Sequence, residues 1–190
     1  MTFTKLKYYI SNIRLQKEDG TWWSEPESYY LVDYGDGVSD KITIKNVPVG
    51  SYKAIHFIHG VDSVRNFSGA QEGALAISNN MFWGWNSGYI MMKLEGNSPQ
   101  ATNGNFAYHL GGFSGDNNVV TPKSTEFGST SLHIKGGKTP KVVFAVNPAR
   151  AWHTVGSMTG LPNAIHMPSE TTTTMAKDLF SWTSIVELTE

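Results

Sequence analysis

Residues 80 to 96 read Asn80-Met-Phe-Trp-Gly-Trp-Asn-Ser-Gly-Tyr-Ile-Met-Met-Lys-Leu-Glu-Gly96, and they decide how the rest of the chain is interpreted. Trp83 and Trp85 are separated by one residue and precede a serine-glycine break and the run Tyr89 to Glu95. Successive side chains of a strand point to opposite faces. The odd positions of the run would therefore share one face, and the apolar even positions, Ile90 to Leu94, the other. This pattern predicts a half-buried strand whose entrance carries two indoles.

The two tryptophans have a structural and a functional interpretation. Large aromatic residues are mostly buried on average, so Trp83 and Trp85 could be core or rim residues of a β-protein. Exposed or half-exposed indoles at the entrance of a strand could also bind a ligand through their apolar faces. The residues alone leave both interpretations open.

Composition and length favour one all-β domain over residues 1–190. The chain has 190 residues, of which 16% are charged, and glycine and aromatic residues are plentiful. This balance is more typical of extracytoplasmic β-proteins than of cytosolic helical enzymes. The formal net charge is -1 and the charges are not segregated by sign, so we expect no nucleic-acid partner. No apolar run approaches the length of a membrane span.

The chain contains no cysteine, which removes disulfides, thiolate metal sites, iron–sulfur clusters and covalent haem attachment. The first residues, Met1 to Lys5, lack the apolar core of a signal peptide and open directly into a strand pattern. We therefore expect a mature protein from which an export segment was removed, with Met1 in its place. The expected location is the periplasm, the cell surface or the medium.

Alternation and turn residues predict strands along most of the chain and a helix near its end. Leucine, methionine and phenylalanine at helical spacing predict the helix over residues 171–182, with Ser169 or Thr171 as its cap. Asp62 and Asn66 are expected to fix a loop or cap a helical turn, and not to be catalytic. The strands are expected at residues 6–15, 29–33, 41–47, 51–59, 89–95, 106–111, 129–135, 141–147 and 182–188.

A loop of hairpin length joins the strand at 89–95 to the strand at 106–111, so the two are expected to pair antiparallel. His109 would then lie near the middle of the hairpin, within reach of Tyr89, Met91 and Trp85. His56 and His59 lie three residues apart in a strand and therefore on opposite faces, which makes them a poor chelating pair.

Several short motifs occur in one order along about residues 5 to 115, and in that order they resemble the MbnP-like family. They are Tyr29-Tyr-Leu-Val-Asp33, Val47-Pro-Val-Gly-Ser-Tyr52, Gly60-Val-Asp-Ser63 with Asn66 and Ser68-Gly69, Met81-Phe-Trp-Gly-Trp85, Gly88-Tyr89, Glu95-Gly96 and Tyr108-His-Leu-Gly111. The resemblance implies an exported, immunoglobulin-like antiparallel β-sandwich with a short C-terminal helix. The sequence departs from the family pattern at His59, where the family usually has an aliphatic residue. No ligand role is therefore assigned to His59.

The resemblance also implies a function. Its characterised branch binds copper, as Cu(I) or Cu(II), through histidines and a tryptophan that a partner di-haem enzyme of the MauG type oxidises. Trp83 or Trp85 would be that tryptophan, and an outer-membrane transporter would be a second partner. Imidazole suits copper and thioethers suit Cu(I). His109 is the first expected ligand, and the candidates for the second are His56, His153 and His166.

Other functions were weighed against copper binding. The chain has no Gly-x-Ser-x-Gly nucleophile motif, and we expect a scavenger or carrier and not an enzyme. The main alternative is a glycan- or protein-recognition module that uses exposed aromatic residues and needs no metal. Convergence of two histidines beside an indole would favour the metal interpretation.

Overall fold

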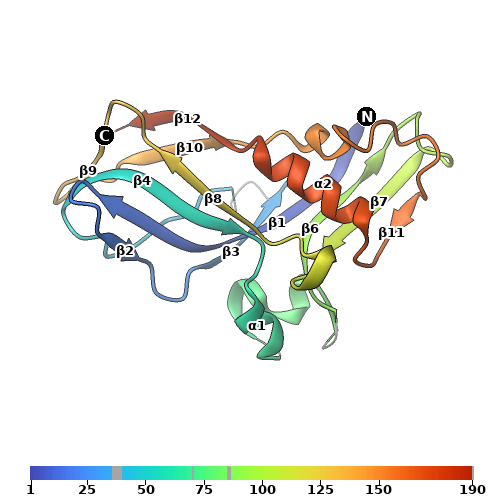
Figure 1. The fold of residues 1–190 in the computed structure, drawn as a ribbon, viewed down its shortest axis with the longest axis horizontal. Coiled ribbons are helices and arrows are strands. Elements are labelled where there is room, and N and C mark those ends of the chain that lie inside the picture. The colour runs from blue at the N-terminus through green and yellow to red at the C-terminus, as the bar shows by residue number, and fades with distance from the viewer. Residues whose placement is uncertain (36–39, 70, 85–86, 190) are drawn as a thin grey trace.

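The computed structural model describes residues 1–35, 40–69, 71–84 and 87–189, and these are mostly β-structure (Figure 1). Two α-helices are described, α1 (Ser63–Phe67) and α2 (Glu170–Ser181), together with short 3-10 turns that include η1 (Gly73–Leu75), η2 (Ile77–Asn79), η3 (Gly115–Asn117) and η4 (Pro148–Trp152). The strands are β1 (Thr2–Lys17), β2 (Trp22–Ser24), β3 (Tyr29–Tyr34), β4 (Gly50–His59), β5 (Phe82–Gly84), β6 (Gly88–Asn97), β7 (Asn105–Gly111), β8 (Thr121–Glu126), β9 (Leu132–Ile134), β10 (Lys141–Ala145), β11 (Ala164–Ile165) and β12 (Ser184–Thr189).

The long strand β1 organises the main sheet. Its first half pairs with β6 and its second half with β4, and the pairing with β4 shifts register between Ser11 and Arg14. Asn12 lies in this irregularity with φ of 55°, a left-handed conformation that asparagine tolerates better than most residues. β1 changes neighbours from β6 to β4 between Tyr8 and Ile10, and so joins the two ends of the molecule.

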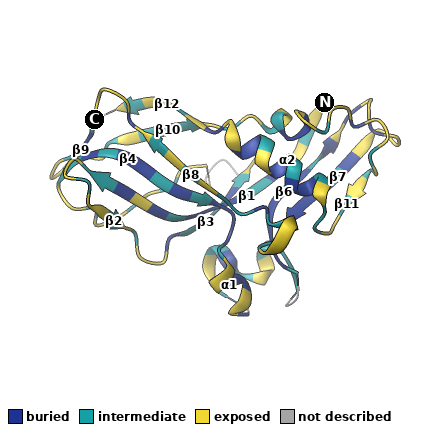
Figure 2. Cartoon of the chain, in the orientation of Figure 1, coloured by how far each residue is buried: buried dark blue, intermediate teal, exposed yellow. Residues whose placement is uncertain are grey.

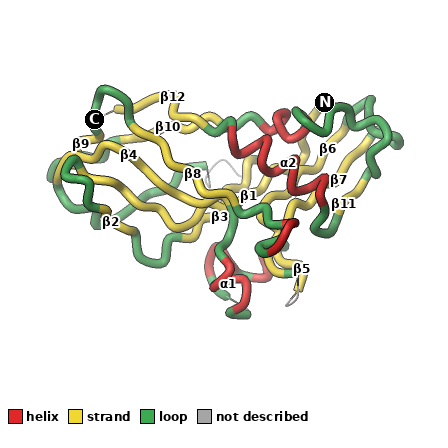
Figure 3. The backbone as a smooth tube through the Cα atoms, in the orientation of Figure 1, coloured by secondary structure: helices red, strands yellow, loops and turns green. Residues whose placement is uncertain are grey.

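Among the described residues the main sheet has ten strands, with the path β11-β7-β6-β1-β4-β8, and β10 and β12 form a separate two-stranded sheet. All pairings are antiparallel except the one between β11 and β7. The predicted β class and C-terminal helix are therefore confirmed. In place of a wholly antiparallel immunoglobulin-like sandwich, the structure has one large mixed sheet with a small sheet packed near one end (Figure 3).

Two hydrophobic clusters support the sheet, and Figure 2 shows their buried residues concentrated in the strands. The first cluster joins β6 and β7 to α2, and it includes Tyr108, Leu110, Met175 and Leu179. The second joins β1 and β4 to the two-stranded sheet, where Phe57 and Phe144 make an edge contact. Each end of the long sheet therefore has its own covering layer.

Helix α2 begins as its sequence predicts. Ser169 is the N-cap: its hydroxyl accepts from the backbone N–H of Thr172, and the Thr172 hydroxyl accepts from the Ser169 N–H, which completes a capping box. Met175, Leu179 and Phe180 are fully buried against the sheet, whereas Trp182 at the end of the helix is 48% exposed. None of the helices in the described ranges is long and apolar enough to cross a membrane.

Two predicted elements differ from the structure. Residues 41–47 alternate in burial, with Ile42 and Ile44 packed on the second cluster, but no strand is assigned to them among the described residues. The alternation of apolar residues there reflects the burial of one face of the segment and not hydrogen bonding to a neighbouring strand. Residues 121–126 are not among the predicted strands, but they form β8, which pairs with β4 although its sequence is largely polar.

Candidate functional site

The tryptophan stretch is held in place by Asp62 and Asn66, two residues of the family motifs. The Asp62 carboxylate caps α1 by accepting from the Arg65 N–H, as the sequence predicts, and it also accepts from the Asn12 side chain at the bulge of β1. Buried Asn66 accepts from the Tyr89 N–H at 2.9 Å, which fixes the start of β6. Gly88 has φ of +69°, and a Cβ there would lie 2.2 Å from the Asn66 amide oxygen. Glycine is therefore required before Tyr89.

Trp83 lies against the end of β7. It belongs to β5, which pairs with β6, and its ring is half-buried. A Cβ on Gly111 would lie 2.4 Å from Cζ3 of Trp83, so the indole occupies the space that a side chain at Gly111 would take. Gly111 follows His109 by two residues on the same strand, and the two positions therefore share a face. The Trp83 ring and His109 thus lie on one face of β7, at positions 111 and 109, which are about 7 Å apart along the strand.

The hairpin of β6 and β7 forms as predicted, but its register gives His109 other neighbours. His109 pairs with Lys93 across the strands, in a register that is regular from the Asn97–Asn105 pair to the Met92–Leu110 pair. Nε2 of His109 lies 2.9 Å from Oε1 of Glu95, which is on the same face of β6. The other carboxylate oxygen, Oε2, forms an ion pair with Nζ of Lys5 at 3.2 Å.

The His109 side chain is buried, and its two nitrogens have different surroundings. His109 is 7% exposed, and its Nδ1 is buried and has no hydrogen-bond partner among the residues that the structure describes. Burial lowers the pKa of His109 below its usual value, although the Glu95 hydrogen bond acts in the opposite direction. Burial acts to raise the pKa of Glu95, but hydrogen bonds from His109 and Lys5 outweigh it and hold that pKa below its usual value. A neutral imidazole donating from Nε2 to a carboxylate leaves Nδ1 able to bind a metal.

His166 lies directly beside His109. It follows the short strand β11, whose Ala164 and Ile165 pair with Ala107 and Tyr108, so the next position in this register faces His109. The two imidazole centroids are 4.2 Å apart and their planes are inclined by 43°. His109 is buried and His166 is exposed. Of the predicted second ligands, His166 is the one that the structure brings to His109.

The other two candidate histidines have different neighbours. The His56 ring hydrogen-bonds the Ser124 hydroxyl at 2.8 Å and meets the edge of Trp22. His153 follows η4 and meets the edge of Trp182 beyond the end of α2. Neither position is on β6, β7 or β11, the strands that build the His109–His166 pair.

The methionines near the tryptophans are core residues. Met81, Met91 and Met92 are fully buried, and Sδ of Met91 accepts from the Val61 N–H at 3.1 Å. Trp85, the second tryptophan of the motif, lies outside the described residues. In the part of the chain that is described, no three histidine, aspartate or glutamate side chains are grouped so that they could hold a metal ion.

The face that carries the histidine pair is also positively charged. Lys93 is buried, and its ammonium donates to the Asn80 carbonyl at 2.6 Å. Burial lowers the pKa of Lys93, while the charge of Glu95 raises it. Lys5 and Lys93 therefore both lie near the single carboxylate that holds His109.

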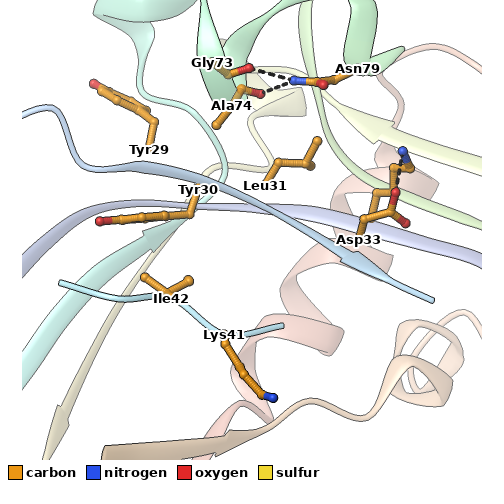
Figure 4. Close-up of a pocket in the computed structure, with 10 residues that line it drawn as sticks. Tyr29, Tyr30, Leu31, Asp33, Lys41, Ile42, Gly73, Ala74 and Asn79 are labelled. Atoms are coloured by element: carbon orange, nitrogen blue, oxygen red, sulfur yellow. Dashed lines mark hydrogen bonds and ion pairs between the residues drawn. The ribbon is translucent and has the colours of Figure 1, made fainter. Parts of the chain in front are cut away.

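A hollow lies elsewhere in the described structure, at β3 (Figure 4). It measures about 450 Å³ and is open to solvent, and it is lined by β3, the loop that carries Ala74 and Asn79, and Lys41 with Ile42. Lys7 and Asp33 form an ion pair in it at 2.7 Å. None of the predicted site residues lines this hollow.

The exposed tryptophans offer little free ring surface for a sugar. Arg150 lies over the ring of Trp182 at 3.5 Å, and Arg14 lies over Trp22 at 4.9 Å. A guanidinium on an indole face occupies the surface on which a sugar ring would stack. These contacts do not favour the glycan-recognition alternative.

Sequence reasoning did not assign a role to Glu95, Lys5 or Gly111. Glu95 and Gly111 both lie within the family motifs, but a strand residue gives no local signal of its cross-strand partner. Gly96 is similar: a Cβ there would lie 2.1 Å from the Thr2 carbonyl oxygen, so glycine lets β1 approach β6. These roles depend on strand register, which only the structure supplies.

Comparison with known proteins gives a family. No curated protein matches the chain. Among solved structures, MbnP from Methylosinus trichosporium is similar with a TM-score of 0.44 and 14% identity, over 74% of this chain. The chain spans 63% of the length of that protein. The MbnP family model matches residues 1–172. The chain therefore belongs to the MbnP family.

Proposed function

We propose that this protein binds copper between His109 and His166, as an exported scavenger or carrier and not as a catalyst. The observation that carries the proposal is the imidazole pair itself, with ring centroids 4.2 Å apart and with Nδ1 of His109 buried and unpartnered among the described residues. A buried polar atom without a hydrogen bond is destabilising unless another interaction compensates for it. A metal ion on Nδ1 would supply that interaction.

The small number of donors favours copper over zinc. Structural zinc sites use four protein ligands, and catalytic zinc sites use three. The described part of the chain shows no such group of three, and the site offers two imidazoles. Neutral imidazole is a good copper ligand. A low-coordinate Cu(I) ion therefore fits this donor set better than Zn²⁺ does.

Binding would require a small movement of His166. In the structure the ring centroids are 4.2 Å apart and the planes are inclined by 43°, so the two rings contact each other directly in a tilted arrangement. His166 is exposed and follows the two-residue strand β11, so its side chain is free to rotate. Rotation would direct a His166 nitrogen at an ion bound to Nδ1 of the fixed His109.

Trp83 is the tryptophan that we propose for oxidation by a di-haem partner enzyme. It is half-buried on the face of β7 that carries His109, next to Gly111. An oxidised ring at this position would add a carbonyl donor close to the histidine pair. Interaction with a MauG-type enzyme, interaction with an outer-membrane transporter and export from the cytoplasm belong to the same proposal and rest on family membership.

Titration of the purified protein with Cu(I) against a competing chelator tests the proposal. One equivalent should bind, and Zn²⁺ at the same concentration should not displace it. Absence of stoichiometric Cu(I) binding, both before and after treatment of the protein with a peroxidase, would overturn the proposal. A mass spectrum of protein purified from its native source would show separately whether Trp83 is oxidised.

A further inference from the structure

The strands on the two sides of β7 supply different partners to His109. Glu95 comes from β6, on one side, and hydrogen-bonds Nε2. His166 follows β11, on the other side. The two nitrogens of an imidazole point away from each other. With Nε2 directed toward β6, Nδ1 is directed away from β6 and toward the side of β7 that carries His166.

The Glu95 side chain is itself held at both oxygens. Oε1 accepts from His109, and Oε2 pairs with the Lys5 ammonium on β1. Lys5 and Glu95 are register partners in the pairing of β1 with β6. The Lys5 ammonium can only donate hydrogen bonds, so the atom of residue 95 that faces it must be an oxygen. The ion pair with Oε2 therefore keeps the carboxylate turned with Oε1 toward His109. A continuous series of polar contacts thus runs across the adjacent strands β1, β6 and β7, from Lys5 to Glu95 to His109.

We propose that Glu95 is a positioning residue that keeps the His109 proton on Nε2 and thereby makes Nδ1 the metal-binding atom. A carboxylate can only accept, so the nitrogen beside it must carry hydrogen, and in the neutral ring the other nitrogen then carries the lone pair. The metal part of this inference rests on the proposed copper function. The part that concerns the tautomer of His109 rests only on the contacts between Lys5, Glu95 and His109.

Glu95→Gln keeps the shape of the side chain but changes its hydrogen-bonding groups, so it tests the positioning role separately from packing. Gln has one oxygen and one amide nitrogen, and Lys5 requires the oxygen. The amide NH₂ would then face Nε2 of His109 and donate to it, which moves the ring proton to Nδ1. Glu95→Gln with Lys5→Met frees the oxygen to accept from His109 again. The double variant should therefore recover what the single variant loses.

The test combines nitrogen NMR of protein labelled with ¹⁵N-histidine with Cu(I) titration. The unsubstituted protein without metal should show hydrogen on Nε2 of His109, Glu95→Gln should show hydrogen on Nδ1, and the double variant should show Nε2 again. Cu(I) affinity should fall about 10- to 100-fold in Glu95→Gln, as is typical for loss of a partner that orients a ligand. The double variant should regain most of this loss. Backbone amide spectra would confirm that each variant is folded.

The outcomes distinguish this inference from the proposed function. Hydrogen on Nδ1 in the unsubstituted protein, or an unchanged tautomer in Glu95→Gln, would overturn the role of Glu95 even if copper binds. The expected tautomers without any Cu(I) binding would remove the copper proposal and leave the role of Glu95 in orienting His109 intact. A loss of affinity in Glu95→Gln that Lys5→Met does not relieve would also contradict the inference, because a merely structural role predicts that result.

Discussion

His109 and His59 are both buried, but only one of them has surroundings that suit a metal ligand. His59, at the end of β4, is 0% exposed, and neither of its ring nitrogens has a hydrogen-bond partner in the described part of the chain. It stacks on Phe180 of α2 at 4.1 Å with the planes 7° apart, and it meets the edge of Phe57. His109 instead has a carboxylate on one side and a second imidazole on the other.

The comparison shows that an unpaired nitrogen is not by itself a site. His59 behaves as an aromatic core residue at a position where the family usually has an aliphatic one, and its role is to pack α2 on the sheet. Burial lowers its pKa from 6.5 to about 3, so it is neutral at ordinary pH. His109 differs because Glu95 fixes one of its nitrogens and a second imidazole, that of His166, lies beside the ring.

Removal of His109 should have the largest effect on binding. His109→Ala deletes one of two proposed ligands, so Cu(I) affinity should fall by more than the roughly 100-fold typical of losing an outer partner. His59→Leu should leave the affinity unchanged, because Leu fills the same space between Phe57 and Phe180. Competition titration of both variants measures this. Equal losses in the two variants would show that the comparison is wrong.

His59 should make the protein sensitive to acid. Its pKa in the folded protein is about 3, below its ordinary value of 6.5, so between these values the unfolded chain binds the additional proton. The stability contributed by neutral His59 is therefore complete above about pH 6.5 and is lost as the pH falls toward 3. At pH 4 the loss should be about 3 kcal/mol. Urea unfolding at pH 7 and pH 4 measures it.

The matched variants for this prediction are His59→Leu and His153→Gln. His59→Leu removes the titrating group, so its stability should decrease less between pH 7 and pH 4 than that of the unsubstituted protein. The charge that faces His59 is that of Lys123 on β8. His153 is exposed, and His153→Gln is the control for replacement of a histidine outside the core. The prediction fails if His59→Leu retains the full acid sensitivity.

Gly111→Ala should disturb the region near His109 and leave the region near His59 intact. The new methyl group would lie 2.4 Å from the Trp83 ring, so the indole must move. Overpacking of this kind usually costs about 1–3 kcal/mol. A lower melting temperature with altered tryptophan fluorescence would support the placement of Trp83. Unchanged fluorescence would contradict it.

Lys5→Met should have the smallest effect. The ion pair between Lys5 and Glu95 is partly exposed, and such pairs contribute less than about 1 kcal/mol. Glu95 can still accept from His109 without Lys5, so Cu(I) affinity should change by less than about 3-fold. Thermal unfolding and competition titration would both detect a larger effect. A 10-fold loss of affinity would show that the Lys5 charge itself holds the site together.

Much of the secondary structure was predictable because its causes are local. The cap at Ser169 and the turn at Asp62 each depend on residues a few positions apart. The alternation around Tyr89 correctly predicted the strand β6, but the prediction that it is half-buried was wrong, because residues 88–94 are all buried. The strand β8 was missed because its residues are polar and its pairing with β4 is a long-range contact. Residues 41–47 were assigned to a strand because alternation reports burial on one face, whether or not hydrogen bonds follow.

The site was predictable only in part, for the same reason. His109 and His166 were both among the expected ligands, but nothing in the sequence separated His166 from His56 and His153. The parallel pairing of β11 with β7 joins residues more than 50 positions apart and places His166 beside His109. Glu95 was visible as a motif residue, but its contact with His109 depends on the register between β6 and β7.

X-ray absorption spectroscopy of the protein loaded with one equivalent of Cu(I) tests the central claim most directly, because imidazole ligands give a distinctive scattering pattern. The account predicts two imidazoles on copper in the unsubstituted protein and in His59→Leu, and one in His166→Ala. A spectrum without imidazole scattering, or one that keeps two imidazoles when His109 and His166 are both replaced by Ala, would contradict it.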